Sequence, residues 1–222
     1  MARTRTVADL ISEIRSRGEV RSSYAADAEV LFYLNTGVAK LYRLIVGVNK
    51  DLYLSSHNLT VVSGTDAYAL AADYWRTVGV EVQDGSYWYP LKRFLYAERL
   101  QYQQTSNRRT TRYRVMGGNV RLSPTPAWAG TVRHWYIPAP PTLAAGGSWD
   151  GFAGWEEFAI VDAVVGLKLK QEEDASGEMT QLQALTAEIK ASSRERDDAE
   201  PDRVRDVENE VVDRDYWVRG GG

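Results

Sequence analysis

The chain contains no cysteine among its 222 residues and only two histidines, His57 and His134. The lack of thiols excludes a disulfide scaffold, a thiolate zinc site, an iron–sulfur cluster and a cysteine nucleophile. Two histidines argue against most histidine-based catalysis and metal binding. No apolar run approaches the ~20 residues of a membrane span, and the N-terminus shows no signal-peptide pattern. We therefore expect a protein that is made and kept in a reducing cytoplasm.

Enzyme motifs are also missing. The chain has no G-x-x-x-x-G-K-[ST] phosphate loop, no H-E-x-x-H metal motif and no G-x-S-x-G nucleophile elbow. It also lacks G-x-G-x-x-G, and Gly146-Gly147 lies outside a strand–turn–helix context. His57, expected in a loop, and His134, expected in a strand, could each be a general base or an ordinary side chain. We predict no enzymatic activity, no cofactor and no metal site.

The composition is that of a globular protein, with 44% hydrophobic and 26% charged residues. Charge is distributed unevenly along the chain. Residues 1–150 carry 18 Lys and Arg against 12 Asp and Glu, whereas residues 151–222 carry 9 against 18. This polarity suggests that opposite ends face different partners, although acidic helices can also serve solubility alone.

Two helices are predicted near the N-terminus. Thr6 and Asp9 resemble a capping box before a first helix that ends at Gly18. A second helix is predicted from about residue 27 to residue 46, with a broad apolar face. Gly37 lies inside this helix, where glycine lowers helix stability by roughly 1 kcal/mol relative to alanine. A glycine at such a position indicates close packing of the helix against a neighbour.

Residues 59–137 have the pattern of short strands. Val78, Val80 and Val82 alternate with polar residues before an Asp84-Gly85 turn. Gly117-Gly118 indicates a hairpin, and a last strand is predicted over residues 131–137. Apolar residues between about 91 and 103 predict a helix that interrupts the strands.

The C-terminal part is predicted to be helical. Residues 138–151, rich in Ala, Gly and Pro, indicate a linker or a long loop. Helices are then predicted over 152–172, from Ser176 onward, and from Pro201 with an apolar stripe of Val204, Val207 and Val211. A charged turn is expected at residues 194–200.

These elements predict an α+β fold in which N- and C-terminal helices form one bundle around an inserted small antiparallel β domain. We expect N-terminal helices over residues 1–58, a β-rich domain with one short helix over 59–137, a linker over 138–151, C-terminal helices over 152–212, and an extended tail over 213–222.

Asp162 falls within the apolar sector of its predicted helix. A buried carboxylate needs a partner, because desolvating it alone is costly. We expect a structural or intersubunit salt bridge, for example with an arginine of the basic half. The alternatives are a catalytic acid, or a position at the stripe's edge that reaches water.

Four arginines, Arg108, Arg109, Arg112 and Arg114, lie within eight residues. They could contact phosphates or an acidic protein surface, or they could form a solvated hairpin edge that prevents aggregation. Sequence-specific DNA reading is disfavoured, because no helix-turn-helix or zinc finger is found.

The C-terminal tail contains an aromatic pair in the run Tyr216-Trp217-Val218-Arg219. Terminal tails are usually disordered unless something holds them. The pair is best interpreted as an anchor for a partner surface, with packing on the chain's own helices as the alternative.

Taken in order, several segments resemble the head–tail connector proteins of tailed phages, the adaptor or head-completion proteins of the neck. These segments are residues 31–35 and 41–45, 59–70, 121–126, 132–138, and 155–174.

The resemblance implies a ring of about twelve copies beneath the portal, with packaged DNA passing through it. Such a ring closes the filled capsid and docks the tail or the next neck protein, in a virion assembled in the host cytoplasm. It implies that the tail, with Tyr216, Trp217, Val218 and Arg219, binds the portal, and that the Arg108–Arg114 hairpin faces a partner or the DNA. The alternatives are a stopper, a tail terminator, a carboxylate-based glycan hydrolase or a DNA-binding regulator.

Overall fold

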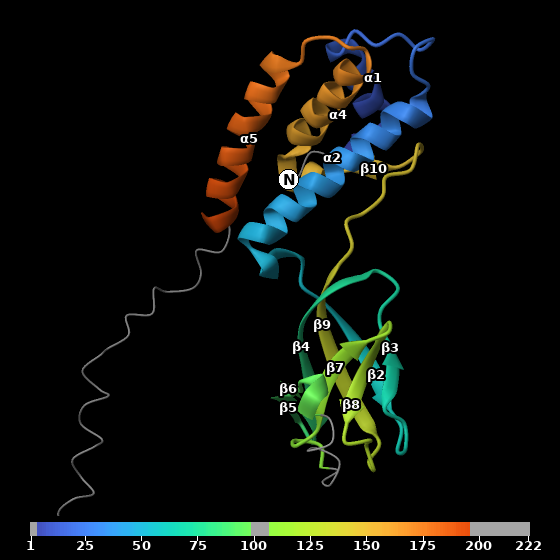
Figure 1. The fold of residues 1–222 in the computed structure, drawn as a ribbon, viewed down its shortest axis with the longest axis vertical. Coiled ribbons are helices and arrows are strands. Elements are labelled where there is room, and N and C mark those ends of the chain that lie inside the picture. Colours follow the sequence, from blue (N-terminus) through green and yellow to red (C-terminus); the bar gives the residue numbers. More distant parts are fainter. Residues whose placement is uncertain (1–3, 99–106, 196–222) are drawn as a thin grey trace, which may run out of the picture.

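The computed structural model describes residues 4–98 and 107–195, which form two lobes along the long axis (Figure 1). One lobe contains the helices and is called the helical lobe. The other contains most of the strands and is called the sheet lobe. The predicted α+β fold, with strands inserted between N- and C-terminal helices, is confirmed for these residues. The helix predicted from Pro201 and the tail 213–222 lie outside the described residues.

The helical lobe is built from both ends of the described chain. Its elements are β1 (Arg5–Thr6), α1 (Val7–Arg17), α2 (Asp27–Val48), β10 (Ser148–Trp149), α3 (Gly151–Gly154), α4 (Glu156–Lys170) and α5 (Ser176–Glu195). β1 pairs with β10, and α5 packs against α4 and α2. The capping interaction at the start of α1 is present, because Thr6 Oγ1 accepts from the Asp9 amide (3.1 Å) and donates to its carboxylate (2.6 Å). The charged turn expected at residues 194–200 is wrong for its first two residues, since α5 extends to Glu195, and its remainder lies outside the described residues.

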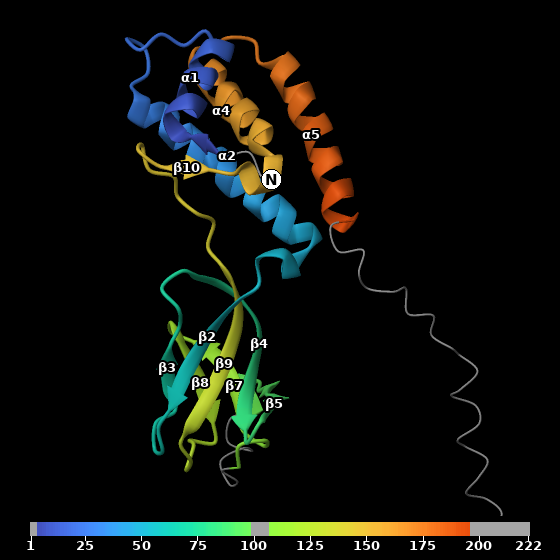
Figure 2. The ribbon, with the colours of Figure 1, turned by 180° about the vertical axis from the view of Figure 1, so that it is seen from behind.

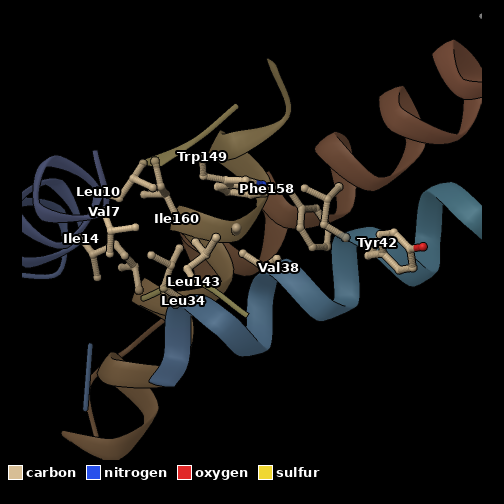
Figure 3. Packing of buried hydrophobic residues seen from close by; sticks show 14 of the residues in the cluster. Val7, Leu10, Ile14, Leu34, Val38, Tyr42, Leu143, Trp149, Phe158 and Ile160 are labelled. Atoms are coloured by element: carbon tan, nitrogen blue, oxygen red, sulfur yellow. The ribbon is translucent and has the colours of Figure 1, made fainter. Parts of the chain in front are cut away.

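The core of the helical lobe lies between α1, α2 and α4 (Figure 3). Leu34 and Val38 of α2 and Phe158 and Ile160 of α4 all belong to this core and are buried. Every residue from Phe158 to Val165 is buried, so α4 is the central helix. Burial on this scale makes packing of α4, rather than helix propensity, the main source of stability in this lobe.

Asn35 of α2 forms two hydrogen bonds with the segment 139–147, which connects the sheet lobe to the helical lobe. Its side-chain amide donates to the Leu143 carbonyl (3.2 Å), and its carbonyl oxygen accepts from the Leu143 amide (2.7 Å). Leu143 and Trp149 are buried in the helical core. The Pro- and Gly-rich segment is thus held in place by a side chain of α2.

The sheet lobe consists of two four-stranded sheets that enclose a second core (Figure 2). Their orders are β2-β9-β4-β5 and β3-β8-β7-β6, antiparallel except for the β6–β7 pair. The strands are β2 (Ser55–Val61), β3 (Ala67–Ala69), β4 (Tyr74–Asp84), β5 (Tyr87–Pro90), β6 (Lys92–Arg93), β7 (Arg112–Met116), β8 (Asn119–Ser123) and β9 (Gly130–Pro138). Short 3₁₀ helices, η1 (Lys50–Tyr53) and η2 (Tyr96–Glu98), flank them.

Both predicted turns are present in this lobe. Gly117 and Gly118 join β7 to β8 with φ values of 57° and 77°, the backbone of a type I′ hairpin turn. Gly85, with φ 63°, lies in the turn between β4 and β5. Glycine is favoured at these positions because positive φ strains other residues.

The helix predicted from about residue 91 is wrong over the described residues. Leu91 donates its amide to the Val80 carbonyl, and Phe94 donates to the Tyr113 carbonyl, so both join the strands. The side chains of Leu91 and Phe94 are buried in the sheet lobe. Leu95, the residue before η2, is 59% exposed. Long-range backbone pairing has overridden a local helical pattern here. Residues 99–103 lie outside the described residues.

The two lobes meet at Tyr42 of α2. Its ring lies 5.0 Å from that of Tyr53, 6.0 Å from Trp75 of β4 and 5.5 Å from Phe152 of α3. Its hydroxyl donates to the Pro138 carbonyl at 2.8 Å. Burial raises the pKa of Tyr42 to about 12, so the hydroxyl stays protonated as a donor.

Candidate interaction surfaces

Asp162 forms an ion pair with a lysine of the neighbouring helix. Both carboxylate oxygens of Asp162 accept from Lys40 Nζ of α2, at 2.8 and 2.9 Å. The Asp162 side chain is 6% exposed and that of Lys40 is 54% exposed. The observed partner therefore belongs to the same chain and is not an arginine. The pair joins α2 to α4 and presents its cationic end to the surface.

A groove of about 430 Å³ opens beside this ion pair, between α2, α4 and α5. Lys40 and Asp162 form one part of its lining, and Val165, Met179 and Leu182 form an apolar part. Met179, Leu182, Leu185 and Ile189 form the apolar stripe of α5, yet Met179 is 48% exposed. We call this hollow the α5 groove.

The first two arginines of the basic cluster lie at one end of the sheet lobe. Arg109 Nε donates to the Asp84 carboxylate at 2.8 Å, and its guanidinium lies 4.1 Å from the Tyr89 ring centre. Arg108 donates to the Ala129 carbonyl and lies 3.7 Å from the same carboxylate of Asp84. Asp84 thus offsets part of the charge at this end.

The other two arginines lie on β7 itself. The Arg114 guanidinium is 6.0 Å from the ring centre of Tyr96, and Arg112 is opposite Ser123 of β8. The structure therefore brings Arg108 and Arg109 together at Asp84 but does not bring Arg112 and Arg114 to that carboxylate. The predicted hairpin is correct, and its cluster divides into two parts.

A third surface was not found from the sequence. On the β4–β5–β9 sheet, the Arg133 guanidinium lies 3.9 Å from the Trp88 ring centre and 5.5 Å from that of Trp135. The indole of Trp135 donates to Glu81 at 2.9 Å. Tryptophan and arginine are enriched at the centres of protein interfaces. The only sequence signal was the alternation of Arg133 and Trp135 around a buried residue.

The two histidines lie side by side, which corrects the expectation of a loop at His57. His57 belongs to β2 and pairs directly with His134 of β9. Both Nδ1 atoms are buried without a hydrogen-bond partner among the described residues, and His134 Nε2 is 3.0 Å from Thr77 Oγ1. Burial, and then the nearby His57, lower the pKa of His134 to about 4.

The described residues offer neither a metal site nor a membrane-spanning helix. Within residues 4–98 and 107–195, no three His, Asp or Glu side chains are grouped to hold a metal ion. In the same part of the chain, no helix has the length and apolar character needed to cross a membrane. Tyr216, Trp217, Val218 and Arg219 lie outside the described residues, so their predicted role stays a prediction.

These features define a two-lobed α+β protein that combines charged and aromatic groups on several surfaces. Residues 5–205 match the family model of the SU10 adaptor protein, and the chain belongs to this family. It is therefore a structural adaptor protein of the phage virion, which interacts with other capsid or tail proteins. A search of curated proteins found no match.

Proposed function

We propose that this adaptor forms a homo-oligomeric ring of about twelve copies beneath the portal of a tailed phage. The ring closes the DNA-filled capsid and docks the tail or the next neck protein. The family match over residues 5–205 carries this proposal. The protein acts by binding and by ordering segments during assembly, without bond chemistry.

The two unlike lobes support a protein with two different axial faces. The helical lobe leads, after Glu195, into the acidic C-terminal segment, while Arg108 and Arg109 lie on the sheet lobe (Figure 1). A ring of such copies would offer one face to the portal and another to the tail. The arginines would face a protein partner or the packaged DNA.

The tail 213–222 is the proposed portal anchor. Tyr216 and Trp217 supply rigid aromatic surface, and Arg219 supplies a charge-assisted hydrogen-bond donor. One such tail would bind the portal only weakly. A ring presents many tails at once, and their combined binding is much stronger than that of a single tail.

The test measures binding of the purified protein to an isolated portal ring. The full chain should bind, whereas the chain ending at residue 212 and the Tyr216→Ala/Trp217→Ala variant should lose binding. Tyr87→Ala is the matched control, because Tyr87 is an aromatic residue of the sheet lobe that is 71% exposed. Equal binding by all four proteins would reject the anchor.

A further inference from the structure

The apolar stripe of α5 is incompletely covered where it borders the α5 groove. Ile189 is fully buried toward the end of this helix, but Leu182 is only half-buried and Met179 is 48% exposed. Val165 and the Asp162–Lys40 pair line the opposite side. A mainly apolar hollow flanked by an ion pair suits an amphipathic helix, which would add apolar contacts while its charged sides stay in water.

We propose that residues 201–212 of the same chain form this helix and fold back into the α5 groove. The stripe Val204, Val207 and Val211 would contact Met179, Leu182 and Val165. This inference goes beyond the ring and portal roles and does not depend on them. It concerns the isolated protein before assembly.

The length and position of the chain after α5 favour this occupant. α5 ends at Glu195, and 27 residues follow it in the sequence. Residues 196–200 can span up to about 17 Å, which suffices for a turn before Pro201. Met179 lies about 24 Å before the end of α5, so the linker must also run about 9 Å back beside α5. A helix of 201–212, about 18 Å long and antiparallel to α5, then reaches Met179 with Val211. The resulting pair is a helical hairpin.

Charge and covalent linkage point the same way. Residues 201–212 carry Asp202, Asp206, Glu208 and Glu210 against two arginines. Lys40, whose side chain is 54% exposed at the groove, offers a cation to the acidic flank of such a helix. Because the segment is attached to α5 by five residues, its effective concentration at the groove exceeds that of any second copy in dilute solution.

The oxidation of methionine provides a direct assay of coverage. The chain has three methionines, of which Met179 lines the groove and Met116 ends β7 in the sheet lobe. Under dilute peroxide, sulfoxide formation at each can be followed by peptide mass spectrometry. Met116 reports the general reactivity of the protein, and Met179 reports coverage of the groove.

The comparison uses full-length variants. Val207→Asp places a carboxylate in the apolar stripe, and it should speed oxidation of Met179 severalfold while leaving Met116 unchanged. Asn209→Asp, a matched change on the opposite side of the same predicted helix, should leave both rates unchanged. Equal Met179 rates in wild type and Val207→Asp would overturn the proposal.

Concentration separates the chain's own segment from that of a second copy. Coverage by the same chain predicts a Met179 rate that is independent of protein concentration. A rate that falls as concentration rises would instead assign the groove to a neighbouring copy and would also overturn the proposal. The oxidation assay contains no portal protein, so its result is independent of the portal-binding test. Either proposal can therefore be rejected while the other is supported.

Discussion

Gly37 of α2 lies directly against the backbone of Ala159 in α4. A Cβ atom built on Gly37 would come within 2.8 Å of the Ala159 carbonyl oxygen and 3.0 Å of its Cα. Such a contact with backbone atoms cannot relax by rotating a side chain. Gly37 therefore sets how closely the two central helices of the helical lobe approach.

The first prediction follows from this contact. Gly37→Ala should lower the free energy of unfolding by about 1–3 kcal/mol, since overpacking outweighs the gain in helix propensity. Gly47→Ala, in the same helix but with no atom within 4 Å of the added Cβ, should raise it by up to about 1 kcal/mol. Urea unfolding measures both, and stabilisation by Gly37→Ala would contradict the close approach.

The second prediction concerns the asymmetry of the Lys40–Asp162 pair. Lys40→Met leaves a carboxylate that is 6% exposed without its cation, and should cost about 3 kcal/mol. Asp162→Asn leaves a lysine that can turn toward water, so its cost should be smaller, about 1 kcal/mol. Urea unfolding again gives the comparison. The account is wrong if Asp162→Asn costs as much as Lys40→Met.

The third prediction is a loss of stability in mild acid. The folded protein holds His134 neutral down to about pH 4, whereas the unfolded chain binds a proton below about pH 6.5. Stability from this group is therefore present above pH 6.5 and is lost as the pH falls toward 4, by up to about 3 kcal/mol.

Unfolding midpoints of wild type and His134→Gln, measured from pH 7 to pH 4, test this sign. The variant should lack this part of the decline, since glutamine can bond to Thr77 but does not titrate. His57→Gln serves as the control and should keep most of it. Identical pH profiles for wild type and His134→Gln would refute the prediction.

The fourth prediction concerns the junction of the lobes. Tyr42→Ala removes a buried ring that contacts Tyr53, Trp75 and Phe152, and should cost about 3–5 kcal/mol. Tyr42→Phe removes only the hydrogen bond to Pro138 and should cost about 1 kcal/mol. Calorimetry distinguishes them, and similar costs would mean that the hydroxyl rather than the ring holds the junction.

Local signals explain what the sequence predicted well. The Thr6–Asp9 cap, the close packing at Gly37 and the Gly117-Gly118 hairpin each depend on residues near one another in the chain, or on a property of glycine itself. The helix predicted from residue 91 failed because Leu91 and Phe94 are fixed by backbone bonds to Val80 and Tyr113. Local periodicity contains no information about such bonds.

The surfaces were harder to predict for the same reason. His57 could not be assigned to β2 from its polar neighbours, because its pairing partner His134 is far along the chain. Trp88 and Arg133 meet only through the register of three strands. Asp162 was recognisable as a buried acid, yet nothing local singled out Lys40 as its partner.

The central claim is that this adaptor assembles as a ring on the portal. Native mass spectrometry of the 24.9 kDa chain, alone and mixed with a purified portal ring, tests it most directly. The account predicts one complex whose mass equals the portal plus a fixed ring of adaptor copies, lost when residues 213–222 are removed. A chain that stays monomeric and ignores the portal at every concentration would contradict it.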